Sequence, residues 1–162
     1  MYRGLDSRRV YFQNDNIYYE GILAPMENIP LADNSIDVVF SINSLHHSAD
    51  LGQVFREIAR ILKPSGVAYL PEDTAGFLRR SKREKEAQYQ REHLQHNDHV
   101  YSFSQYQRFI LDAALELHVE LPMRFKDKIG VLRYAPRFLL HFIYTVLNHT
   151  LGMPCYLKVK KK

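Results

Sequence analysis

The sequence has few of the features that mark secreted or membrane proteins. Its 162 residues include one cysteine, Cys155, so no disulfide can form within the chain, as in proteins of a reducing compartment. The longest apolar run, "FLLHFIYTVL" (138–147), is too short to cross a bilayer and is interrupted by His141. The N-terminal segment lacks the layout of a signal peptide. We therefore predict a cytoplasmic protein with one domain over residues 1–162.

An excess of positive charge is found only at the C-terminal end. The formal net charge is +4, and the run "KVKKK" (158–162) contains four lysines, so the rest of the chain has no net charge. A nucleic-acid-binding domain carries a basic face rather than a basic tip, so we predict no nucleic-acid partner. A weak contact of residues 136–162 with a membrane surface stays open as an alternative to a helix that packs on its own domain.

Strand and helix signals alternate along the first half of the chain. The runs "MYRGLD" (1–6), "IYYEGILA" (17–24) and "SIDVVF" (35–40) predict strands. A helix should follow Asp50, which can cap it with Gln53 placed for the return contact. The apolar stripe of this helix is formed by Leu51, Val54, Phe55, Ile58 and Leu62.

The run "VAYLPED" (67–73) predicts the next strand, and strand, helix and strand at these lengths predict a parallel pair. We therefore expect an α/β protein in which Val38, Val39 and Phe40 are buried between layers of helices. Ligands of such sheets bind beyond the carboxyl ends of the strands. This places four polar residues that follow Phe40 at the expected binding edge: Ser41, Asn43, His46 and His47.

The second half of the chain predicts three helices and two strands. A charged helix falls within 77–97, and a second helix begins with a capping box of Ser102 and Gln105. Strands are expected at 118–125 and 155–160, with a helix around 136–150 between them. The apolar face of the second helix is predicted to carry Tyr106, Phe109, Ile110, Ala113 and Leu117.

Five short motifs in the first half resemble a known family when they are taken in order. They are Ile29–Leu31, Ile36–Val39, Leu45–His47, Glu57–Leu62 and Lys63–Gly66. This series is similar to the second half of the class I S-adenosylmethionine-dependent methyltransferase domain, in its type 11-like form. The resemblance implies a Rossmann-like sheet with helices on both faces. It also implies an insertion or cap at 126–154 and a closing strand that pairs antiparallel at the sheet edge.

The resemblance further implies S-adenosylmethionine as cofactor. Asp6 would then accept hydrogen bonds from the ribose, and the backbone of Met26, with Glu27 beside it, would meet the adenine. Ser41 and Asn43 would lie near the methionine part of the cofactor.

The resemblance gives the two adjacent histidines the catalytic positions. His47, with His46 beside it, would face a small-molecule or lipid-like methyl acceptor as a general base or substrate contact. A structural role for the two histidines stays open at this point.

One expected motif is absent from the sequence. Family members have a Gly-rich turn after the first strand, where glycine lets the backbone approach the cofactor, and no such turn occurs here. Pro25 also replaces an acidic residue that contacts adenine in the family. We therefore predict an incomplete sheet that lacks the first strand, in a fragment of a longer protein. The alternative is a non-catalytic binding or interaction module that has kept the scaffold.

The sequence predicts no metal site. His93, His96 and His99 follow one another at a spacing of three with Asp98 among them, but the spacing alone lacks the carboxylate or cysteine context of strong metal motifs. The methylated atom and the oligomeric state are left open, because fold-level resemblance does not determine them.

Overall fold

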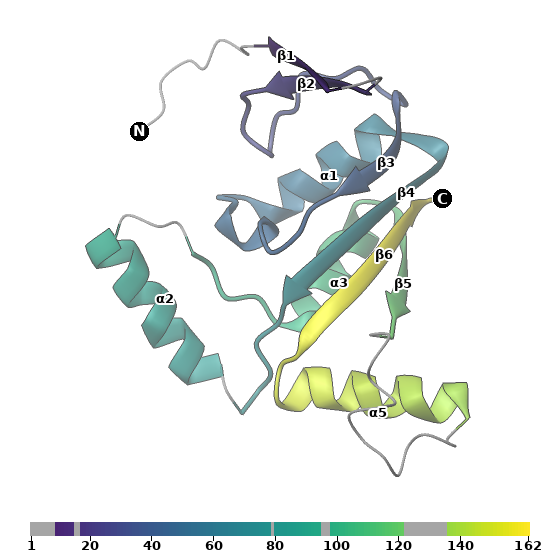
Figure 1. The fold of residues 1–162 in the computed structure, drawn as a ribbon. Coiled ribbons are helices and arrows are strands. Elements are labelled where there is room, and N and C mark those ends of the chain that lie inside the picture. Colours follow the sequence, from purple (N-terminus) through teal and green to yellow (C-terminus); the bar gives the residue numbers. More distant parts are fainter. Residues whose placement is uncertain (1–8, 15–16, 79, 95–97, 122–135) are drawn as a thin grey trace.

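A computed structural model describes residues 9–14, 17–78, 80–94, 98–121 and 136–162 (Figure 1). It confirms the α/β class. The elements in chain order are β1 (Arg9–Asn14), β2 (Ile17–Ile22), β3 (Ile36–Phe40), the 3-10 turn η1 (Leu45–His47), α1 (Leu51–Ile61), β4 (Leu62–Asp73), α2 (Arg80–Leu94), α3 (Phe103–Asp112), β5 (Leu115–Glu120), α5 (Arg137–Thr150) and β6 (Pro154–Lys161).

The main sheet has the strand order β3-β4-β6-β5 (Figure 1). β3 and β4 are parallel and are joined by α1, as the strand and helix signals predict. β6 is antiparallel to both of its neighbours. Its predicted place at the sheet edge is therefore wrong, because β6 lies between β4 and β5. An inner position suits its alternate residues Cys155, Leu157 and Val159, which are buried on the helix-covered face of the sheet.

The first two strands form a separate antiparallel hairpin. β2 confirms the strand predicted at 17–24, whereas β1 was not predicted from the sequence. The strand predicted at 1–6 lies outside the described residues. Within the main sheet, β3 is an edge strand of the described part of the chain.

The main core lies between one face of the sheet and the helices α1 and α3. The predicted stripe of α1 is buried, with Phe55 in edge-to-face contact with Tyr106 of α3 at a centroid distance of 6.5 Å. The sheet contributes Ala68 and Leu70 from β4 together with the buried residues of β6. This packing holds β3, α1 and β4 in fixed register, and it thereby positions the turn that follows β3.

The opposite face of β3 is open, contrary to prediction. Val38 is 45% exposed and Phe40 is 69% exposed, although both were expected between helix layers. Phe40 instead stacks on Tyr69 of β4, at a centroid distance of 5.3 Å. The apolar run predicted burial, but burial of a strand residue requires an element packed on its own face of the sheet.

The boundary between α3 and β5 also differs from the prediction. The capping box of Ser102 and Gln105 is present, but the helix ends at Asp112 and Leu117 belongs to the strand. Ala114 has a φ of 57°, a left-handed conformation that stops the helix, and the strand starts at Leu115 rather than at 118. The part of the predicted strand beyond 121 lies outside the described residues.

α5 lies between β5 and β6 in the chain and packs through Leu140 and Tyr144. It confirms the helix predicted around 136–150, while the proposed insertion at 126–154 lies partly outside the described residues and stays a prediction. The outer side chains of α5 are exposed, such as Phe138 at 77%. The helix ends beside the start of β6, whereas the lysine run lies toward the other end of that strand (Figure 1). None of the described helices is long and apolar enough to cross a membrane.

Candidate functional site

The candidate site is the turn that leaves the carboxyl end of β3. Pairing with β4 continues beyond the strand, because the Ser41 amide donates to the Tyr69 carbonyl (3.2 Å) and the Asn43 amide to the Pro71 carbonyl (2.9 Å). Asn43 has a φ of 46°, which turns the chain away from the sheet. The Ser41 and Ser44 hydroxyls lie 2.7 Å apart. The turn is thus well defined, and the Asn43 side chain stays exposed.

Glu72, at the carboxyl end of β4, organises the histidine-bearing turn η1. Its carboxylate is fully buried and accepts hydrogen bonds from the backbone amides of Ser44 (2.8 Å) and Leu45 (2.9 Å). The second oxygen lies 3.0 Å from His46 Nδ1. This hydrogen bond, against partial desolvation, raises the pKa of His46 above its ordinary value. A buried carboxylate therefore fixes both the turn and the orientation of His46.

His47 forms a second histidine–carboxylate pair beside the first. Its Nδ1 lies 2.7 Å from Oδ1 of Asp98, a residue of the segment that precedes α3. The same segment is joined to the turn by a hydrogen bond from the His99 amide to the His46 carbonyl (2.9 Å). The rings of His46 and His47 are 4.1 Å apart between centroids. Two neighbouring imidazoles, each oriented by a carboxylate, therefore stand at the binding edge of the sheet.

A cavity of about 280 Å³ opens beside His46. Its wall is shared by the ends of β4, by α2 and by the segment before α3, and its charged residues are Asp73, Arg83, Glu86 and Asp98. Arg83 is held by the Thr74 carbonyl (3.1 Å) and lies 3.9 Å from Asp73. Among the described lining residues three carboxylates accompany one guanidinium, so this part of the cavity favours a cation or a group that donates hydrogen bonds.

The residues predicted to bind the cofactor are spread over two segments. Ser41 and Asn43 lie at the end of β3, while Met26 packs against the main core from the segment after β2. Glu27 Oε1 accepts hydrogen bonds from the amides of Ala49 (2.7 Å) and Asp50 (3.2 Å), just before α1. Asp6 lies outside the described residues.

The start of α1 differs in one detail from the predicted capping box. Asp50 accepts the amide of Gln53 at 2.9 Å, as expected. The return contact to the Asp50 amide, however, comes from Glu27 rather than from Gln53, whose side-chain amide donates to the Glu27 carbonyl (3.3 Å). Glu27 satisfies this amide from a distant segment, which local spacing does not predict.

Arg60 of α1 anchors the loop that follows Met26 and Glu27. Its guanidinium donates to the carbonyls of Ile29 and Leu31, both at 2.7 Å, and to Glu57 at 2.8 Å. This hydrogen bond from Arg60 lowers the pKa of Glu57, and the Ile29 amide, 2.9 Å from Oε2, acts in the same direction. The candidate cofactor segment is therefore tied to the same helix as the histidine turn.

Glu72 was missed from the sequence, although an acidic residue at the carboxyl end of a strand beside β3 was a usable signal. Asp98 was noted only as a neighbour of the histidines at 93, 96 and 99, and its contact with His47 was not predicted. The predicted triplet His93, His96 and His99 is not described as a unit, because His96 lies outside the described residues.

Comparison with known proteins agrees with this architecture. Residues 5–70 match a protein-family model described as a methyltransferase domain. A segment of 40 residues is 52% identical to the uncharacterized protein YafE of Escherichia coli, and it covers 25% of this chain and 19% of that protein. A malonyl-[acyl-carrier protein] O-methyltransferase of Methylovorus is 41% identical over 66 residues, which are 39% of this chain and 22% of that protein.

The fold also matches solved structures. A phosphoethanolamine N-methyltransferase of Haemonchus contortus, solved in complex with S-adenosyl-L-methionine, superposes with a TM-score of 0.56 at 20% sequence identity. The match covers 84% of this chain and 35% of that one. The chain thus spans about a fifth of each of the two curated relatives described above.

Proposed function

We propose that this chain is part of a class I methyltransferase, an enzyme that transfers a methyl group from S-adenosylmethionine to a small-molecule or lipid-like acceptor; the methyltransferase-domain match over residues 5–70 and the matching fold support this. The observation that supports this most is the pair of oriented histidines at the carboxyl edge of parallel strands, beside a cavity. Ligands of doubly wound sheets bind at this edge. The relatives differ in acceptor, so the acceptor class is not taken from any one of them.

The end of β3 suits one part of such a cofactor. Ile42 is 66% exposed and stands between Ser41 and Asn43, so an apolar surface adjoins a hydroxyl and an amide. A nucleoside with an amino-acid arm presents the same mixture of apolar and polar groups. The Met26 backbone and Glu27 would approach the cofactor from the neighbouring segment, with Glu27 also capping α1.

The two histidines can accept the proton that the methyl acceptor loses. When bound, the cofactor supplies an activated methyl group on a sulfonium, and its transfer is an in-line displacement that depends mainly on positioning. With Nδ1 directed at Glu72, His46 has Nε2 left to accept the proton that an acceptor hydroxyl or amine loses. His47 is oriented by Asp98 in the same way. Each carboxylate stabilises the imidazolium that forms.

Calorimetric titration with S-adenosylhomocysteine tests this proposal. We expect binding with a Kd below about 1 mM. Asn43→Gly keeps the left-handed backbone and removes the side chain, so it should weaken binding by about 10-fold. Asn34→Gly is the matched control, since Asn34 has a φ of 53° before the opposite end of β3.

The outcomes separate the alternatives. No binding at millimolar concentrations would refute the proposal and favour the non-catalytic module. Equal affinity of the Asn43→Gly variant and the unmodified chain would show that the cofactor does not contact Asn43 at the end of β3. Equal loss in both glycine variants would show a general effect of loop flexibility rather than a contact.

A further inference from the structure

Two histidines and an aspartate converge at the turn after β3. One ligand atom from each of His46, His47 and Asp98 can be chosen so that all three atoms lie within 4.8 Å of one another. We propose that these side chains bind a divalent transition-metal ion of the kind that imidazole ligands prefer, such as Zn²⁺. The site contains none of the histidines at 93, 96 and 99 and shares only Asp98 with that cluster.

The three ligand atoms are close enough to share an ion once the side chains adjust. Zinc lies about 2.0–2.2 Å from nitrogen and oxygen ligands, so two ligand atoms of a tetrahedral site are roughly 3.5 Å apart. The upper bound of 4.8 Å on their present separations requires movements of up to about 1 Å. His47 Nδ1 and Asp98 Oδ1 are already 2.7 Å apart, and His47 is exposed, so its side chain can adjust.

Glu72 supplies the outer support that metal-bound histidines usually have. A ligating histidine commonly donates its other ring N–H to a carboxylate, which fixes the ring and the tautomer. His46 Nδ1 lies 3.0 Å from the buried Glu72 carboxylate, so Nε2 is the ligand atom in the metal-bound chain and acts as a proton acceptor only in the metal-free chain. The same carboxylate holds two backbone amides of the turn, and it therefore cannot rotate away.

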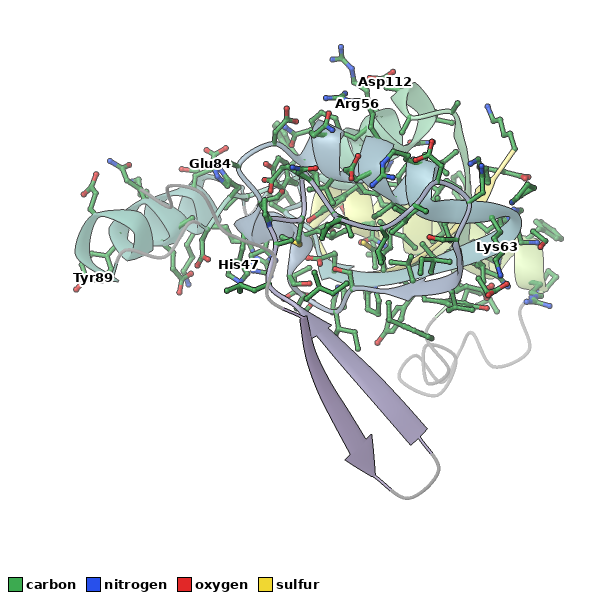
Figure 2. All side chains as sticks on the ribbon, turned by 90° about the horizontal axis from the view of Figure 1, so that it is seen from above. His47, Arg56, Lys63, Glu84, Tyr89 and Asp112 are labelled. Carbon is green, nitrogen blue, oxygen red and sulfur yellow. The ribbon has the colours of Figure 1, made fainter. Side chains whose placement is uncertain are left out.

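The surroundings favour a cation with an open coordination position. His46 and Asp98 both line the cavity beside the turn, whose other carboxylates are Asp73 and Glu86. Of the described lining residues, Arg83 alone carries a guanidinium, which donates to the Thr74 carbonyl. Three protein ligands next to a cavity are the arrangement of ion sites that keep one position for water or a ligand. His47 lies at the side of the sheet from which α2 projects (Figure 2).

The test measures metal binding directly, without cofactor or acceptor. The full chain is stripped with a chelator and titrated with Co²⁺, followed by its visible absorption, and with Zn²⁺ by calorimetry. We expect one ion per chain, and little competition from a large excess of Mg²⁺, which prefers oxygen ligands.

Variants locate the ion. His47→Ala and Asp98→Asn should each weaken binding at least 10-fold, and Glu72→Gln by about 10-fold through the loss of outer support. His118→Ala is the matched control, because His118 also lies beside a carboxylate, Glu116 at 3.2 Å, but on β5. Circular dichroism checks that each variant is folded.

Two results of the metal titrations would overturn the proposal. Absence of stoichiometric Co²⁺ or Zn²⁺ binding refutes it, and so does equal affinity of the unmodified chain and the His47→Ala variant. Binding that the His118→Ala change weakens as much as His47→Ala would place the ion elsewhere. Titration with S-adenosylhomocysteine is independent of these results, so failure of this proposal is distinguishable from failure of the proposed function.

Discussion

Glu72→Ala should be among the most damaging single substitutions in this chain. The side chain is fully buried and holds the turn through two backbone amides and His46. Alanine leaves the amides of Ser44 and Leu45 without their acceptor, at a cost of about 1–3 kcal/mol each, and it also leaves a small cavity. We expect the free energy of unfolding to fall by about 3–5 kcal/mol, as measured by urea denaturation.

Glu72→Gln separates the charge from the shape. A single amide oxygen can still accept both backbone amides, so the expected loss is only about 1–2 kcal/mol. The hydrogen bond that raises the pKa of His46 becomes a neutral one, and this pKa should return toward its ordinary value. Proton NMR of the His46 ring in the presence of a chelator measures the change.

The Glu72→Gln change should also alter how the free energy of unfolding depends on pH. Because the pKa of His46 is raised in the folded state, its contribution is fully present below the unfolded pKa, about 6.5. It is lost as the pH rises through the folded pKa. The Glu72→Gln variant should therefore lose less stability than the unmodified chain between about pH 6 and pH 8.

Glu116 provides the matched control for the Glu72 variants. Glu116→Ala removes an exposed glutamate that also lies beside a histidine, and it should change the free energy of unfolding by less than about 0.5 kcal/mol. A loss of less than about 1 kcal/mol in Glu72→Ala would refute the role assigned to the carboxylate. An unchanged His46 pKa in Glu72→Gln would refute the cause assigned to the shift.

Four other substitutions have expected outcomes that urea denaturation can check. The pKa of Glu57 is lowered in the folded state, so this carboxylate stabilises the fold above the unfolded pKa of about 4.5, and that stabilisation is lost as the pH falls through the folded pKa. Glu57→Gln should therefore make the free energy of unfolding less dependent on pH in the acid range, and an unchanged dependence would contradict this. Tyr106→Phe should be neutral or stabilising by up to about 1 kcal/mol, since the buried hydroxyl has no hydrogen-bond partner within the described part of the chain; a clear loss would show that it bonds to Glu72. Gly152→Ala should cost more than about 2 kcal/mol, because Gly152 has a φ of 69° and a Cβ would overlap the Gly76 backbone, whereas Gly52→Ala inside α1 should be neutral or stabilising by up to about 1 kcal/mol.

Local patterns were sufficient to predict most of the elements. The apolar stripe of α1, its Asp50 cap and the capping box of α3 are confirmed, because helices are formed by contacts between residues three and four apart. The ordered motifs between Ile29 and Gly66 resemble the methyltransferase domain whose family model matches residues 5–70, and the parallel pair β3 and β4 follows from the strand and helix signals. The sequence also placed two histidines at the end of β3.

Only the tertiary structure decided how these elements meet. Glu72 contacts a turn 26 to 28 residues away, and Asp98 reaches His47 from beyond α2. The inner position of β6 and the exposure of Phe40 depend on which elements cover each face and edge of the sheet. Hydrophobic period and capping act within a few residues, whereas strand order and the pairing of a carboxylate with an imidazole depend on segments brought together by packing. The sequence by itself therefore determined the elements and the end of β3 at which polar chemistry lies, and the packing of distant segments decided which carboxylates orient the histidines there.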